Sequence, residues 1–291
     1  MKIYQKLLLY VLIAVVAAAV LSPWVFAAWN SFASSRREPA FEQIFGGVFI
    51  AAGVLLLVAT PSLLRPRILR DGGIVSSGRR NVFYGFLLAV ASMALLGVVM
   101  VLTGAITPGV SDPLYSIVRQ SGKALVTALM VGFLEELFFR GMLFRGLMEN
   151  SRPAVAFVVA NLFYAVSHFF KPPEEFLVAG IDPLAGFRFL ALCLAPFLDP
   201  AAILPGVIGL FLIGVVLSYA LVRTGSLYLS IGLHAGWVFA IKTLSLYGYF
   251  TRADLGWVFG AKPKLVSGAA TWVGILLVGC VVHVMTRRRL S

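Results

Sequence analysis

Two adjacent carboxylates and an arginine are the residues of this chain whose types and spacing best suit chemistry. Glu135, Glu136 and Arg140 stand inside a run from Ala124 to Phe144 that is otherwise apolar apart from Thr127. A run of about 20 apolar residues is long enough to cross the hydrocarbon core of a bilayer. A charged side chain near the middle of a membrane costs about 3 kcal/mol, so such residues usually face a bundle interior and carry function. The stretch therefore predicts a functional site inside a membrane.

Helical geometry places the two carboxylates on different faces of the helix, so only one of them can pair with the arginine. Glu136 and Arg140 are four residues apart, about 40° around an α-helix, so they can form an ion pair on one face. Glu135 is five residues from Arg140, about 140° away, and does not share that face. We therefore expect the arginine to neutralise one carboxylate and leave the other to hold or deprotonate a water molecule. The alternative is a buried ion pair that only fixes helix packing.

Two of the three histidines lie in other apolar segments that also carry polar or small residues. His168 follows Tyr164 by four positions and Asn161 by seven, so the three share one face of a predicted helix. His234 lies in a later segment. Its small neighbours would let another helix approach closely; they are Gly232, Ala235 and Gly236.

A carboxylate and two imidazoles in a cavity of low dielectric suit the activation of water for hydrolysis. Glu135 can act as the general base, while His168 and His234 orient the water or stabilise a developing oxyanion. The same three side chains could instead ligate a single Zn²⁺, which accepts His and Glu and leaves one position open for water. The chain contains no HExxH motif, so a zincin helix is excluded. Metal-free and zinc-dependent hydrolysis both stay open.

The order of these motifs resembles the CAAX-protease and bacteriocin-processing family, also described as type II CAAX prenyl endopeptidases. The motifs are Glu-Glu-x-x-x-Arg at 135–140, Tyr164 four residues before His168, and His234 in a later segment. The resemblance covers about residues 120–245. It implies an eight-helix membrane fold, a polar site that opens toward the cytoplasm, and hydrolysis of a peptide bond in or near the bilayer.

The resemblance also implies a role for each site residue. Glu135 would be the catalytic base or a metal ligand, and Glu136 and Arg140 would support it. His168 would help to activate water, and His234 would stabilise the oxyanion or bind a metal. The implied substrate is a membrane-associated protein or peptide, and we expect a metal-free mechanism in preference to one with zinc.

Two positions depart from the family pattern. The second motif usually has Phe four residues before its histidine, where this chain has Tyr164. The third usually has Asn or another polar residue four after its histidine, where this chain has Val238. Valine cannot donate a hydrogen bond, and the loss of one transition-state donor typically costs about 2.7–4 kcal/mol. Asn161, on the face of His168, is the candidate replacement.

Composition identifies the class of protein. Of the 291 residues, 60% are hydrophobic and only 12% are charged, compared with about 25% charged residues in a soluble domain. We therefore expect one all-α polytopic membrane domain over residues 1–291, with the peptidase-like core at 120–245. The net charge of +12 comes mostly from short loops, where basic residues set topology and contact lipid headgroups. No basic stripe with interleaved aromatic residues indicates a nucleic-acid partner.

Eight apolar windows predict eight transmembrane helices in one bundle. They cover about 7–29, 44–64, 83–106, 121–148, 153–170, 201–222, 226–246 and 269–286. We interpret the first window as a span because it is longer than the h-region of a signal peptide. Between the fifth and sixth windows, the shorter apolar piece from Phe189 to Leu198 is interrupted by Pro196. That piece is expected at the membrane interface or as a re-entrant segment.

Basic residues predict the orientation. They concentrate in the loop after the second window and at the C-terminus, and six predicted spans separate the two. The residues are Arg65, Arg67, Arg70, Arg79, Arg80, Arg287, Arg288 and Arg289. The positive-inside rule then puts both termini in the cytoplasm. We expect the inner or plasma membrane of a bacterium or archaeon.

Two other classes of function stay open at this point. The first is a non-catalytic membrane scaffold or binding protein that keeps the bundle and its ion pair, and Val238 favours it. The second is a proton-coupled transporter that uses Glu135 and the histidines as a relay. The absence of a detectable repeat in the sequence counts against a transporter.

Overall fold

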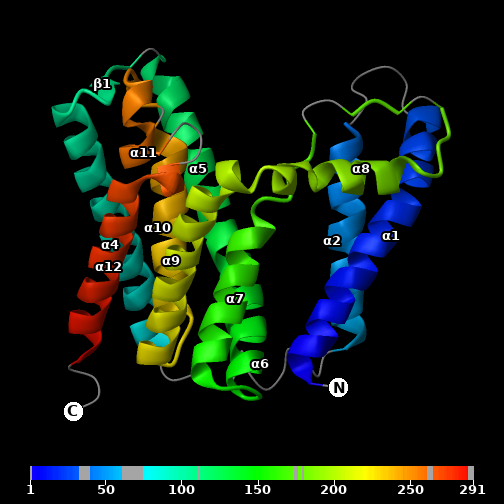
Figure 1. Ribbon diagram of the computed structural model, residues 1–291, viewed down its shortest axis with the longest axis horizontal. Coiled ribbons are helices and arrows are strands. Elements are labelled where there is room, and N and C mark those ends of the chain that lie inside the picture. Colours follow the sequence, from blue (N-terminus) through cyan, green and yellow to red (C-terminus); the bar gives the residue numbers. More distant parts are fainter. Residues whose placement is uncertain are drawn as a thin grey trace. The chain divides into compact units, whose positions relative to one another are not determined.

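The computed structural model is mainly helical (Figure 1). It describes residues 2–32, 40–60, 75–110, 112–173, 176–178, 180–244, 246–260 and 265–287. The chain divides into two compact units. The first contains Met1–Arg67 and Val166–Ile203, and the second contains Ile68–Ala165 and Leu204–Ser291. The expectation of a single domain stays a prediction.

The first unit is built from α1 (Ile3–Phe32), α2 (Phe41–Ala59) and α8 (Ala185–Cys193). Its core is aromatic: Phe41 packs edge-on against Phe26 and Phe189, with ring centroids 5.5 Å apart in each pair. A Cβ at Gly186 would clash with the backbone carbonyl of Ala19, so the glycine lets α8 lie directly on α1. A turn at Leu194 separates α8 from the short helix η3 (Ala195–Leu198), which has Pro196 in its first turn.

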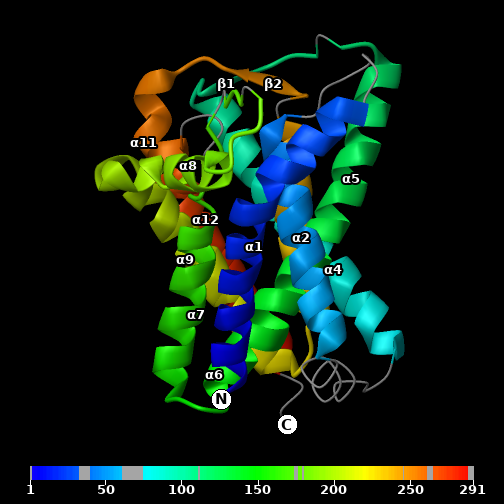
Figure 2. The same cartoon turned by 90° about the vertical axis from the view of Figure 1, so that its right-hand side faces the viewer.

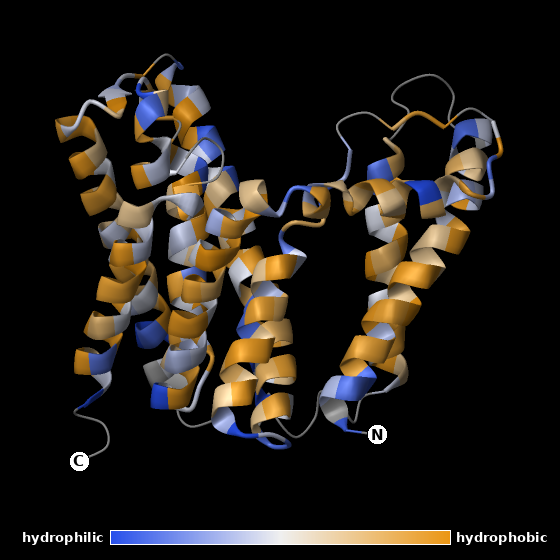
Figure 3. Cartoon of the chain, viewed as in Figure 1, coloured by the Kyte–Doolittle hydropathy of each residue, from blue (hydrophilic) through white to orange (hydrophobic). Residues whose placement is uncertain are grey.

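The second unit contains the elements that carry the polar motifs. They are α4 (Val75–Leu102), α5 (Leu114–Glu136), η2 (Leu137–Phe144), α6 (Arg145–Met148), most of α7 (Pro153–Ser167) and α9 (Pro200–Thr224), α10 (Tyr228–Leu244) and α12 (Ala269–Arg287). These segments are apolar along most of their length (Figure 3). A helix satisfies its own backbone hydrogen bonds, which is what an apolar segment needs within lipid.

Small residues let α10 pack closely between α4 and α5. A Cβ at Gly232 would clash with the carbonyl of Val82 on α4, and one at Gly236 would also meet the backbone of α4. On the other side, a Cβ at Gly132 of α5 would lie 3.0 Å from a backbone nitrogen of α10. The close approach that the sequence predicted around His234 is therefore confirmed.

A small antiparallel ribbon joins the end of α4 to the segment after α10 (Figure 2). Strand β1 (Ile106–Pro108) pairs with β2 (Gly248–Phe250), with Ile106 opposite Phe250. This ribbon was not predicted from the sequence, because each strand is only three residues long. The remaining elements are the short helices η4 (Ala253–Leu255), α11 (Gly256–Phe259) and η5 (Leu265–Ser267).

Each of the eight predicted windows overlaps a helical segment, but fewer helices meet a strict criterion for a span. Among the described residues, four helices are long and apolar enough to cross a membrane: Tyr4–Ser31, Gly78–Leu102, Pro200–Thr224 and Ala269–Arg287. Two shorter apolar helices are Phe41–Leu56 and Pro153–Ser167. Eight transmembrane helices therefore stay a prediction, whereas a helical fold with membrane spans is supported.

The residues behind the predicted orientation are only partly described. Arg65, Arg67, Arg70, Arg288 and Arg289 lie outside the described residues. Arg79 and Arg80 lie near the start of α4, and Arg287 ends α12. The cytoplasmic location of both termini stays a prediction.

We predict that Gly232→Ala lowers the free energy of unfolding by about 1–3 kcal/mol, because the new methyl group would overpack the contact between α10 and α4. The measurement is the thermal unfolding midpoint of the purified protein in detergent. Gly274→Ala on α12 is the matched control, since no described atom lies within 4 Å of the added Cβ. Equal midpoints for the two variants would contradict the close packing.

Candidate functional site

The helix that carries the two carboxylates changes its winding immediately after them. α5 ends at Glu136, and the backbone from Leu137 to Phe144 widens into a π-helical segment before α6 resumes at Arg145. We predicted one helical span over 121–148, and the change of winding inside it corrects that prediction. Wide turns of this kind occur frequently at functional sites. Arg140 lies inside the widened segment.

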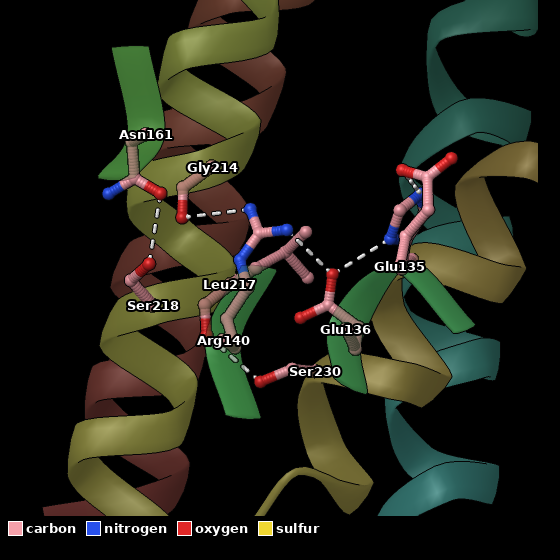
Figure 4. A network of polar contacts seen from close by, with 9 residues as sticks. Glu135, Glu136, Arg140, Asn161, Gly214, Leu217, Ser218 and Ser230 are labelled. Atoms are coloured by element: carbon pink, nitrogen blue, oxygen red, sulfur yellow. Dashed lines mark hydrogen bonds and ion pairs between the residues drawn. The ribbon is translucent and has the colours of Figure 1, made fainter. Parts of the chain in front are cut away.

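Glu136 and Arg140 form the predicted ion pair, and both are buried. Arg140 Nη1 donates to Glu136 Oε1 at 2.8 Å, and the two side chains are 1% and 0% exposed. Arg140 Nη2 also donates to the backbone carbonyl of Gly214 on α9, at 3.4 Å (Figure 4). The guanidinium therefore connects the motif helix to α9.

Tyr164 of α7 completes the surroundings of the arginine. Its ring lies against the guanidinium, with Arg140 Cζ 4.3 Å from the ring centroid. A cation this close to an aromatic face is attracted by the ring quadrupole. The same ring presents its edge to His234, with centroids 6.1 Å apart and planes at 90°. The second motif thus contributes Tyr164 to the polar cluster.

His234 lies between the two carboxylates. Its Nδ1 is 2.8 Å from Glu136 Oε1, and its Nε2 is 3.8 Å from Glu135 Oε2. Because an ionised carboxylate only accepts hydrogen bonds, Nδ1 must carry the proton that it donates to Glu136. In the neutral imidazole, this leaves the lone pair of Nε2 facing Glu135.

The two glutamates differ sharply in access. The side chain of Glu135 is 30% exposed, whereas that of Glu136 is fully buried. Arg140 pairs with Glu136, as the helical-face argument predicted. Glu136 is therefore held by two partners on one oxygen. The side chain of Glu135 is partly exposed, although its Oε2, the oxygen that faces His234, is buried.

A further layer of polar contacts holds α7, α9 and α10 together. Ser218 Oγ donates to Asn161 Oδ1 at 2.9 Å, and Asn161 Nδ2 donates to the carbonyl of Phe157 at 2.8 Å. Ser230 Oγ donates to the carbonyl of Leu217 at 2.9 Å. Neither Ser218 nor Ser230 was predicted as a contact residue, although each is a polar residue in an apolar window. The geometry relates Asn161 to helix packing.

Gly214 has two roles that the sequence analysis also missed. A Cβ at this position would lie 2.8 Å from Asn161 Oδ1, so a larger residue would require the Asn161 side chain to shift. The same residue presents its carbonyl to Arg140. No local signal distinguished Gly214 from the many other glycines of the chain.

Residues 119–240 match the family model described as type II CAAX prenyl endopeptidase Rce1-like. These residues form an Rce1-like domain. The matched segment begins before Glu135 and ends after His234, so it includes all three motifs. No curated protein and no solved structure matches the chain.

The family match indicates the kind of domain that residues 119–240 form. The family is a protease family, and the apolar helices of the chain fit an integral membrane protein. Residues 119–240 therefore resemble a CAAX-type protease domain, and the chain has the apolar helices of an integral membrane protein.

His168 was predicted to assist in the site. It lies in the turn that follows α7, its side chain is exposed, and it belongs to the first unit. Glu135, Tyr164 and His234 belong to the second unit. A part for His168 in the site therefore stays a prediction.

The predicted zinc site needs three protein ligands and one open position. The second unit offers Glu135 Oε2 and His234 Nε2, which face one another. The described residues contain no group of three or more His, Cys, Asp or Glu side chains that could hold a metal ion. The described residues of this unit do not by themselves complete a zinc site.

We predict that Arg140→Ala lowers the free energy of unfolding by about 3–5 kcal/mol, because it leaves Glu136 as an uncompensated buried charge. Thermal unfolding in detergent measures the effect. Arg152→Ala, which removes an exposed arginine at the start of α7, is the control and should change stability little. The double replacement Arg140→Met with Glu136→Leu should recover most of the loss, since an apolar pair often replaces a buried ion pair without cost. A double variant as unstable as Arg140→Ala would contradict this account.

Proposed function

We propose that this protein is an intramembrane endopeptidase that hydrolyses a peptide bond in a membrane-associated protein or peptide. Glu135 acts as the general base, and His234 and His168 assist. The observation that carries the proposal is the position of His234, with Nδ1 against the buried Glu136 and Nε2 facing the partly exposed Glu135. A general base also needs access to a water molecule, and Glu135 is the more exposed of the two carboxylates.

The distance between Glu135 and His234 suits a shared water molecule. Two acceptors 3.8 Å apart can both receive hydrogen bonds from one water at ordinary lengths of about 2.8 Å. A water that donates one proton to Glu135 Oε2 and the other to His234 Nε2 turns its lone pairs outward. Those lone pairs can attack the carbonyl carbon of a peptide bond.

The proton balance of the reaction involves Glu135 alone. As the water oxygen bonds to the carbonyl carbon, Glu135 takes the released proton and the carbonyl oxygen becomes an oxyanion. When the carbon–nitrogen bond breaks, Glu135 returns that proton to the leaving amine. The products are a carboxylic acid and an amine, and the carboxylate of Glu135 is restored.

The buried partners act by positioning. Arg140 holds Glu136, and Glu136 fixes the ring and tautomer of His234. Tyr164 packs against both Arg140 and His234 and limits how either can turn. We propose that these residues prepare the base and the water, and that they do not touch the substrate. His168 is proposed to contribute to water activation on the strength of the family resemblance.

Arginines at the ends of helices support the predicted orientation in the membrane. Arg79, Arg80, Arg223 and Arg287 lie at the beginning of α4 and at the ends of α9 and α12. Arg223 donates to Thr286 on α12, so these two helix ends lie together. Their charge supports a cytoplasmic location. We propose eight spans, cytoplasmic termini, and the inner or plasma membrane of a bacterium or archaeon.

A non-catalytic scaffold is the second candidate, and one observation favours it. The ion pair of Glu136 and Arg140 is fully buried and held by α9 and α10, as a purely structural pair would be. Val238, one turn after His234, supplies no hydrogen-bond donor to a transition state. A scaffold would keep its stability when Glu135 is replaced, and it would have no cleavage activity to lose.

We predict that Glu135→Gln reduces peptide cleavage at least about 100-fold, because a positioned general base contributes about 10²–10⁴ to the rate. Purified wild type and variant would be incubated with a library of membrane-tethered peptides, each with and without a chelator. Cleavage that persists with the chelator supports the metal-free mechanism, whereas cleavage that stops supports zinc.

Controls separate a lost base from a lost fold. Glu149→Gln changes an exposed carboxylate at the end of α6 and should leave cleavage intact. Glu135→Gln should unfold at the same temperature as wild type, since Glu135 is partly exposed. His168→Ala should reduce cleavage if that residue assists. Full activity of Glu135→Gln would refute the proposed base, and a wild type that cleaves nothing would favour the scaffold.

We predict that Val238→Asn raises the cleavage rate about tenfold or more. The replacement adds an amide donor one helical turn from His234, and single oxyanion donors contribute about 2.7–4 kcal/mol in other hydrolases. The rate constant at saturating peptide is the quantity to measure. Val238→Leu is the control, because it adds volume without a donor. An unchanged or lower rate for Val238→Asn would show that position 238 does not reach the transition state.

A further inference from the structure

An apolar groove of about 500 Å³ runs along the second unit between α4 and α5. Its walls are helical stripes spaced by three or four residues, as on one face of a helix. The lining residues are Val82, Phe83, Phe86 and Leu87 on α4 and Leu125 and Leu129 on α5, with Arg79 and Tyr228 at one end. Phe83 is 58% exposed and Leu129 is 41% exposed. The groove is therefore open to the surroundings of the protein.

The packing of α10 explains why protein does not fill this groove. α4 rests on Gly232 and Gly236 of α10, while α5 rests on the opposite side through Gly132. Both α4 and α5 are thus packed against α10. Their faces that point away from α10 do not meet, which leaves the groove between them. The space is a consequence of the same contacts that position His234.

One end of the groove is polar and positively charged. Arg79 is exposed there, and the ring of Tyr228 packs against Gly78, where an added Cβ would lie 2.9 Å from the ring. The tyrosine is thus held beside the arginine. The described residues that line the groove include no carboxylate. From Arg79 to Leu87 the α4 wall is about 12 Å long, at 1.5 Å per residue.

The chemistry of the walls distinguishes between possible occupants. Both walls are helices whose backbone groups are already hydrogen-bonded, so they offer no partners to the backbone of a bound peptide. An acyl chain has no polar groups to satisfy and suits such a surface. The arginine at the mouth complements a phosphate, and basic residues near the cytoplasmic leaflet attract anionic lipids.

We infer that this groove binds one anionic phospholipid, with an acyl chain between α4 and α5 and its phosphate against Arg79 and the phenol of Tyr228. The site is separate from the proposed reaction at Glu135. It would be occupied whether or not the protein cleaves peptides.

Native mass spectrometry of the full-length protein tests the inference. Delipidated protein would be mixed with equal amounts of phosphatidylglycerol and phosphatidylcholine of the same acyl chains. We expect one phosphatidylglycerol to be retained in preference to phosphatidylcholine. Arg79→Gln should reduce that retention about fivefold, the effect of one basic residue near an anionic lipid. Arg80→Gln is the matched control, because Arg80 is also exposed on α4 but does not line the groove.

A second variant tests the acyl-chain part of the site. Leu129→Trp places a larger apolar ring in the groove and should displace the lipid without unfolding the protein, because Leu129 is exposed. Glycerol phosphate alone should not compete with phosphatidylglycerol. Equal retention of the two lipids, or equal effects of Arg79→Gln and Arg80→Gln, would overturn the inference. So would a Leu129→Trp variant that keeps its lipid and loses peptide cleavage, since the groove would then hold substrate.

Discussion

The buried contact between Glu136 and Arg140 is the interaction on which the arrangement of the second unit depends. A carboxylate and a guanidinium with almost no exposure are tolerable only when each compensates the other and further hydrogen bonds surround them. The surrounding groups come from three other helices: the Gly214 carbonyl on α9, the Tyr164 ring on α7 and the His234 imidazole on α10. The ion pair therefore specifies how four helical segments meet.

Small residues provide the second constraint. Glycines allow α10 to approach α4 and α5, and Gly214 allows α9 to approach α7. Lipid is as apolar as the helix surfaces, so close backbone approach and interhelical hydrogen bonds must hold membrane helices together. The two constraints support each other, because the approach of α10 brings His234 within 2.8 Å of Glu136.

Much of this could be predicted from single segments of the sequence. The pairing of Glu136 with Arg140 followed from a spacing of four residues, and the close approach around His234 followed from its small neighbours. Gly214, Ser218 and Ser230 were missed because their roles depend on which helices become neighbours, and no spacing within one segment contains that information. The change of winding after Glu136 was missed for a related reason, since Leu137–Phe144 reads as ordinary apolar helix. The role of His168 depends on how residues of the first and second units are arranged. A pattern within one segment does not predict that arrangement.

The wide segment from Leu137 to Phe144 has a consequence for how this helix tolerates changes in length. A π-helical turn shifts the backbone hydrogen bonds by one residue, as if an extra residue had been inserted into an α-helix. Removing one residue after Arg140 could therefore be absorbed by a return to regular winding, with Glu136 and Arg140 still four apart. The side chains that follow the deletion would keep their present orientation relative to α5. An insertion at the same place could not be absorbed in this way, because the turn is already wide. It would rotate α6 by about 100° relative to α5. The helix is thus asymmetric in the indels it can accept.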